Sequence, residues 1–168
     1  MHWLYVVSVW LHILAAAVWI GGMAFLVLVL LPVTRMEEYR GAAAGLINWT
    51  GMRFRFVGWV CFGLLLLSGA VNLLYRGIGW AELTSSEFWA GGFGRAFGLK
   101  MILVAIILAG SAIHDFYIGP RATAAWQADP SSPHAKGLRM QATMFGRVNM
   151  LLALAVVVLA VIMVRGWG

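Results

Sequence analysis

Four long apolar stretches dominate this chain and restrict what it can fold into. They cover roughly residues 3–31, 54–75, 96–118 and 144–164, and each is long enough to cross a hydrocarbon core, which needs about 20 helical residues. Of the 168 residues, 62% are hydrophobic and only 11% are charged, a balance unlike that of soluble domains. We therefore predict an all-α integral membrane protein, in which residues 1–168 form a single four-transmembrane-helix bundle.

Four crossings place the connections on two sides of the membrane, and the basic residues are distributed unevenly between these sides. The first and third connections are flanked by Arg35, Arg40, Arg53, Arg55, Arg121, Lys136, Arg139 and Arg147, and the opposite side has Arg76, Arg95, Lys100 and Arg165. Basic residues favour the cytoplasmic side, so both termini are expected outside. The net charge of +6 is then explained by topology and lipid contact, which argues against a nucleic-acid partner.

The outer loop, residues 76–95, is expected to contain a short interfacial helix. The run Thr84-Ser85-Ser86-Glu87 has the spacing of a capping box, in which the first side chain and the fourth satisfy free N–H groups at a helix start. The predicted helix carries Phe88 and Trp89 to the membrane surface and ends at the glycines that begin with Gly91.

His12 is the most informative residue of the first span. An ionisable side chain in the bilayer core costs a few kcal/mol, so it tends to face the bundle interior and to mark a functional site. At 100° per residue, Ala16, Trp19 and Met23 fall within about 40° of His12. Small neighbours would let a flat ligand approach the imidazole. A histidine that only hydrogen-bonds a neighbouring helix remains the alternative.

Other polar residues recur within the second and third spans. Ser68 and Asn72, four residues apart, are expected to form hydrogen bonds between helices. Counting about 1.5 Å per residue, His12 lies roughly 14 Å below the outer face, Lys100 about 6 Å and His114 about 27 Å. His12 and His114 are therefore not expected to share one ion. His114 is a second candidate metal ligand, with a hydrogen bond to Asp115 or a backbone carbonyl as its more ordinary role.

Several motifs carry a resemblance that covers most of the chain. They are His12-x6-Trp19-x-Gly21-Gly22, Arg53-Phe54-Arg55-Phe56-Val57-Gly58-Trp59 leading to Leu67-Ser68-Gly69, Gly94-Arg95-x4-Lys100, and Arg147-x-Asn149. In these pieces the chain resembles the copper-resistance protein D (CopD) family and, more distantly, the HemJ-type membrane protoporphyrinogen oxidases. The first resemblance implies copper handling in the cytoplasmic membrane. The second implies a bound b-type haem, with His12 as the iron ligand and Lys100 as a functional partner.

The pattern of ligands favours haem over copper. A copper(I) site prefers soft ligands gathered at one depth, whereas the methionines and Cys61 are scattered along the spans. A haem on His12 would direct its propionates to the outer interface, which is rich in basic side chains. We predict a haem b site for electron transfer or porphyrin redox chemistry, with copper binding or transport as the alternative. Its predicted cofactor-binding residues are His12, Trp19, Arg76, Arg95 and Lys100.

Catalytic residues and enzymatic activity are left open, a haem-dependent membrane oxidoreductase being the enzyme class that fits. A third interpretation is a cofactor-free accessory subunit of a larger membrane complex. The expected surroundings are the lipid bilayer of the bacterial cytoplasmic (inner) membrane, crossed several times. A redox partner protein, a larger complex and a homo-oligomer all remain open as partners.

Overall fold

The computed structural model describes residues 2–129 and 131–165, and in this part of the chain it shows helices and no strand. Four long helical rods, each apolar and long enough to cross a membrane, confirm the predicted fold class. The rods are α1 (His2–Phe25) with η1 (Leu26–Leu30) and α2 (Leu31–Val33); α3 (Ala43–Tyr75); α6 (Gly92–Ile113) with η3 (His114–Ile118) and α7 (Gly119–Ala128); and α8 (Pro133–Arg165). The short elements are η2 (Glu37–Tyr39), α4 (Trp80–Thr84) and α5 (Ser86–Ala90).

The rods extend beyond the apolar spans read from the sequence. The second predicted span begins at residue 54, whereas α3 begins at Ala43, so the helix carries Arg53 and Arg55 within it. Hydropathy marks only the part that fits the hydrocarbon core. The helix itself continues into the interface, because nothing there interrupts its backbone hydrogen bonds.

The connection between α3 and α6 holds two short helices where one was expected. The Glu82 carboxylate accepts a hydrogen bond from the Gly79 N–H at 2.7 Å and caps α4. That bond holds the pKa of Glu82 below its ordinary value. The predicted capping box from Thr84 to Glu87 is wrong: the Thr84 hydroxyl donates to the Trp80 carbonyl within α4 at 2.9 Å, and α5 begins after Ser85 without a side-chain cap. The expected end of the helix at Gly91 is confirmed.

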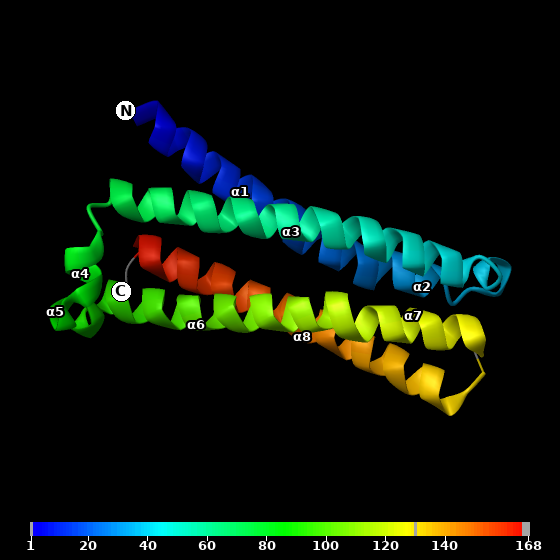
Figure 1. The fold of residues 1–168 in the computed structure, drawn as a ribbon. Helices are drawn as coiled ribbons and strands as arrows, with labels where there is room; N and C mark the ends of the chain where they lie inside the picture. The colour runs from blue at the N-terminus through cyan, green and yellow to red at the C-terminus, as the bar shows by residue number, and fades with distance from the viewer. Residues whose placement is uncertain (1, 130, 166–168) are drawn as a thin grey trace.

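The long rods pack as two pairs, α1 against α3 and α6 against α8 (Figure 1). The start of α1, the end of α8 and the two short helices α4 and α5 lie at the same end of the bundle, which we call the terminal end. The opposite end, with η2 and the connection from α7 to α8, is called the loop end (Figure 1). This arrangement is that of an antiparallel bundle with short connections.

A hydrophobic cluster joins the two pairs in the middle of the bundle. It consists of Ala15, Trp19, Met23, Cys61, Phe62, Ile107 and Ala153. Two glycines allow the close approach of α1 and α3. A Cβ on Gly22 would lie 2.3 Å from Phe54 Cε2, and a Cβ on Gly58 would lie 3.6 Å from Trp19 Cδ1. On α1 the cluster begins at Ala15, so His12 lies one turn beyond it toward the terminal end.

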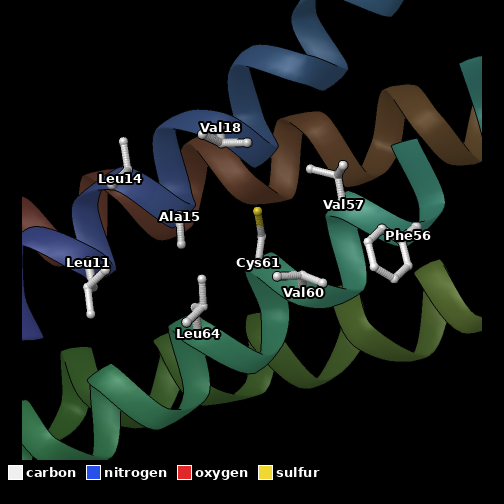
Figure 2. A pocket seen from close by; sticks show the side chains of 9 residues that line it. All are labelled: Leu11, Leu14, Ala15, Val18, Phe56, Val57, Val60, Cys61 and Leu64. Atoms are coloured by element: carbon white, nitrogen blue, oxygen red, sulfur yellow. The ribbon is translucent and has the colours of Figure 1, made fainter. Parts of the chain in front are cut away.

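An apolar groove of about 240 Å³ follows the seam between α1 and α3 (Figure 2). Figure 2 shows the Cys61 sulfur directed toward α1, opposite Ala15. The groove is lined by Leu11, Leu14, Ala15, Val18, Phe56, Val57, Val60, Cys61 and Leu64. Apart from one thiol these side chains are hydrocarbon, so the groove offers no donor set for a metal.

Candidate functional site

His12 is held in a defined orientation by Ser68. The imidazole Nδ1 lies 2.8 Å from Ser68 Oγ, and this hydroxyl lies 2.5 Å from the Leu64 carbonyl oxygen. A serine hydroxyl has a single proton, which Ser68 donates to Leu64. The tautomer that agrees with this bond carries its proton on Nδ1 and donates it to Ser68 Oγ, which leaves the lone pair of the neutral ring on Nε2. This is the tautomer that binds a metal through Nε2.

The backbone of α3 is shaped to accept the imidazole. A Cβ on Gly69 would lie 3.4 Å from His12 Cε1, so glycine at this position leaves the ring room against the helix. One turn earlier on α1, the Ser8 hydroxyl donates to the Ser68 carbonyl at 3.2 Å. Two hydrogen bonds therefore tie α1 to α3 at the level of His12, and the ring is positioned by both helices.

Asn72 supplies a polar atom without a partner close to this pair. It lies one turn beyond Ser68 on α3, and its Oδ1 is buried and receives no hydrogen bond from the described residues. A buried carbonyl oxygen left without a donor costs about 1–3 kcal/mol. The expected interhelical hydrogen bonds are thus made by Ser68, while Asn72 Oδ1 is available to a donor that residues 2–129 and 131–165 do not provide.

Lys100 and Arg76 bring positive charge to the terminal-end side of His12. Lys100, half-buried on α6, interacts electrostatically with His12, and Arg76 at the end of α3 interacts with Lys100. The Arg76 guanidinium also lies 5.6 Å from the centre of the Phe93 ring at the start of α6. The fold thus brings together an imidazole and two cations from three different rods. Such a group favours an anionic ligand at this level.

Two predicted cofactor-binding residues lie apart from this group. Trp19 is buried in the hydrophobic cluster, with its ring centroid 4.8 Å from that of Phe62, about two helical turns from His12. Arg95 is exposed on the first turns of α6. The residues that the structure gathers are His12, Ser68, Asn72, Lys100 and Arg76, which we call the His12 site.

His114 belongs to a separate polar network in the loop-end half of the bundle. Its Nδ1 lies 2.9 Å from Asp115 Oδ1, the role expected as the ordinary one. Trp59 Nε1 donates to Asp115 Oδ2 at 3.1 Å, and Arg55 donates to the Asp115 main-chain oxygen at 2.7 Å. Sequence reasoning missed Arg55 and Trp59, although their spacing of four residues on α3 was a usable signal. Asp115 therefore links α3 to the rod that contains η3.

Metal-ligating histidine, cysteine and carboxylate side chains are not clustered in the described chain. Among residues 2–129 and 131–165, no three His, Cys, Asp or Glu side chains are grouped so that they could hold a metal ion. The His12 site offers one imidazole nitrogen, together with hydrogen-bonding and cationic groups. It can contribute one ligand to a metal whose other ligands come from a bound molecule.

Comparisons with known proteins place this chain in a family. The family described as "Copper resistance protein D" matches residues 49–163, which include nearly all of α3, α6, α7 and α8 but not His12. An uncharacterized protein of Aquifex aeolicus (strain VF5) is 27% identical over 153 residues, which are 90% of this chain and 89% of that protein. No solved structure matches the chain. The protein belongs to the copper resistance protein D family and is a multi-pass protein of the inner membrane.

Proposed function

We propose that this protein binds a b-type haem at the terminal end of its bundle for electron transfer or porphyrin redox chemistry, and that His12 Nε2 would hold its iron. The observation that carries the proposal is the 2.8 Å contact between His12 Nδ1 and the Ser68 hydroxyl, which leaves Nε2 as the ring nitrogen for a ligand. Histidines that bind metals almost always donate their other ring N–H to a fixed acceptor.

The residues of the His12 site fit a haem better than they fit a bare ion. A porphyrin supplies four ligands of its iron, so the protein needs only one or two imidazoles. Lys100 and Arg76 would neutralise the propionates through charge-assisted hydrogen bonds. The unpartnered Asn72 Oδ1 would accept a hydrogen bond from a water or a protonated group that accompanies the ligand. When bound, the haem supplies a reversible one-electron change at its iron.

Residues of this chain that surround His12 would set the properties of the site. Ser68 fixes the imidazole plane, and Gly69 lets the ring lie close to α3. The hydrophobic cluster that begins at Ala15 excludes water from the side of the ring facing the loop end. Burial and hydrogen bonding at the ligand are the means by which a protein adjusts a haem potential.

Copper binding or transport is the second candidate, and membership of the copper resistance protein D family favours it. Copper(I) would require soft ligands near His12. Cys61 and Met23 are buried in the hydrophobic cluster, and Met101 is 38% exposed on α6. These side chains do not form a group around the imidazole, so the present geometry supports copper less well than haem.

The experiment is a pair of titrations on detergent-purified protein. Haem is titrated while the Soret band is followed, and copper(I) is titrated against a competing chelator. Three forms are compared: wild type, His12→Ala, and His114→Ala as a matched control that removes another half-buried imidazole. We expect stoichiometric haem binding by wild type and His114→Ala, and a loss of the Soret shift in His12→Ala.

Two other outcomes would replace the proposal. Tight copper(I) binding that is lost in His12→Ala, without haem binding, would assign the site to copper. Failure of the folded wild type to bind either ligand would favour the cofactor-free accessory subunit.

A further inference from the structure

A second cavity lies at the loop end, far from the His12 site along the bundle. It has a volume of about 530 Å³ and is formed by the segment that follows α2 and by the first half of α8. Its lining consists of Arg35, Arg139, Met140, Thr143, Met144 and Arg147. The cavity therefore combines three guanidinium groups with two thioether side chains.

The arginines of this cavity form no ion pair within the described residues. Its six lining residues include no acid, and the ion pair that the described residues form is His114–Asp115, which lies elsewhere. Arg35 and Arg139 are close enough to interact electrostatically. Two like charges at this range repel each other, and the repulsion is stronger next to a low-dielectric membrane than in water. An anion between the guanidinium groups would turn this repulsion into attraction.

The guanidinium of Arg139 is oriented so that it could bind such an anion. Its guanidinium lies 3.4 Å from the centre of the Trp126 ring, so stacking on α7 fixes its plane. A stacked guanidinium keeps its N–H edge available for hydrogen bonds. The fork of N–H groups on arginine matches the oxygens of a phosphate, to which it donates two parallel hydrogen bonds.

The apolar part of the cavity indicates where the anion comes from. Met140 and Met144 are 72% and 62% exposed. Together with Arg147 they lie within about 60° of one another around α8. A free phosphate would contact the arginine side chains and leave the methionine side chains exposed to solvent. A phospholipid would place its phosphate on the arginines and the start of an acyl chain along the methionines.

We propose that the cavity binds a phosphate-bearing anion, and that its physiological occupant is the headgroup of an anionic phospholipid. Single arginines near helix ends commonly extend to the lipid headgroups without forming a site. Here three of them, from the segment after α2 and from two turns of α8, line one cavity, and a tryptophan on α7 orients one of them. The site is independent of the haem proposal, since it shares no residue with the His12 site.

The test measures lipid retention by the full chain in detergent. Native mass spectrometry and the thermal unfolding midpoint are recorded after addition of phosphatidylglycerol, phosphatidylcholine or inorganic phosphate. We expect phosphatidylglycerol to be retained and to raise the midpoint, and phosphatidylcholine and inorganic phosphate to do neither. The double variant Arg35→Gln/Arg147→Gln should bind phosphatidylglycerol about tenfold more weakly or worse, since two charge-assisted contacts are lost.

Matched controls separate a site from general charge. Arg40→Gln removes an exposed arginine near Arg35, and Arg121→Gln removes one that stacks on Tyr117 at 3.5 Å, as Arg139 stacks on Trp126. Both controls should retain the lipid. The single variant Arg35→Gln, in an exposed connection, serves if the double variant does not fold. The proposal would be overturned if the control variants lost phosphatidylglycerol equally, or if the Arg35 and Arg147 variants bound it as tightly as the wild type. It would also be overturned if phosphatidylcholine were retained and raised the midpoint equally. Stabilisation by inorganic phosphate alone would show that the anion is not supplied by a lipid.

Discussion

Replacing Ser68 with alanine separates an imidazole that is oriented for a ligand from one that is merely packed. The change removes the acceptor of the His12 Nδ1–H, 2.8 Å away, and also the hydroxyl that donates to Leu64. The imidazole then loses the partner that selects its tautomer and plane. The Ser8 hydroxyl still has its acceptor, because that bond is made to the main-chain oxygen of residue 68.

Two effects of this change can be compared by their usual magnitudes. Loss of the residue that accepts a hydrogen bond from a metal-bound histidine commonly weakens metal binding about 10- to 100-fold, which corresponds to about 1.4–2.7 kcal/mol. The cost to folding should be smaller, about 1 kcal/mol, as for one net hydrogen bond. We therefore expect Ser68→Ala to remain folded and to bind haem at least tenfold more weakly than the wild type.

The assay is a haem titration, with circular dichroism to confirm the helical fold. Ser111→Ala is the matched control, because Ser111 is also a buried helix serine whose hydroxyl takes part in an interhelical bond, from Asn149 Nδ2 at 2.9 Å. It should lose comparable stability and keep wild-type haem affinity. Equal haem affinity in Ser68→Ala and wild type, or an equal loss in Ser111→Ala, would refute the reasoning.

Three further predictions concern the fold and its orientation. Gly22→Ala should lower the free energy of unfolding by about 1–3 kcal/mol, because the new methyl group meets the Phe54 ring on α3. Gly21→Ala is the control and should leave the free energy of unfolding unchanged, because the space around Gly21 is open. Thermal unfolding in detergent compares the two variants. The side-chain carboxyl of Glu82 should have a pKa below the ordinary glutamate value, which an NMR titration measures. Its stabilising hydrogen bond from the Gly79 N–H should be present at neutral pH and should be lost as the pH falls through that lowered pKa. A cysteine introduced by Ser131→Cys should react with a membrane-impermeant reagent only from the cytoplasmic side, and labelling from outside would reverse the predicted orientation.

Membrane-spanning helices could be predicted because apolar length alone decides them. Each span must satisfy its backbone hydrogen bonds internally, whatever its neighbours are. The same physics does not locate helix ends in the interface, where water and lipid headgroups both satisfy the backbone, and α3 accordingly begins well before its apolar part. The pairing of His114 with Asp115 was expected because adjacent polar side chains in an apolar segment have few other partners.

The gathering of side chains from different rods could not be predicted from single helices. A helical wheel places Trp19 on the face of His12, but it carries no information on how α1 crosses α3, and the ring packs on Phe62 in the cluster. The unpartnered oxygen of Asn72 is likewise a property of the packed bundle. The cavity at the loop end arises because the segment after α2 lies against α8, a contact between residues more than one hundred positions apart.

The most direct test of the central claim is the absorption spectrum of the protein extracted from the membranes of cells that make haem. The account predicts a Soret band and a b-type reduced-minus-oxidised spectrum in the wild type and in His114→Ala, and neither feature in a folded His12→Ala variant. A colourless wild-type protein, or a spectrum that survives the loss of His12 unchanged, would contradict it.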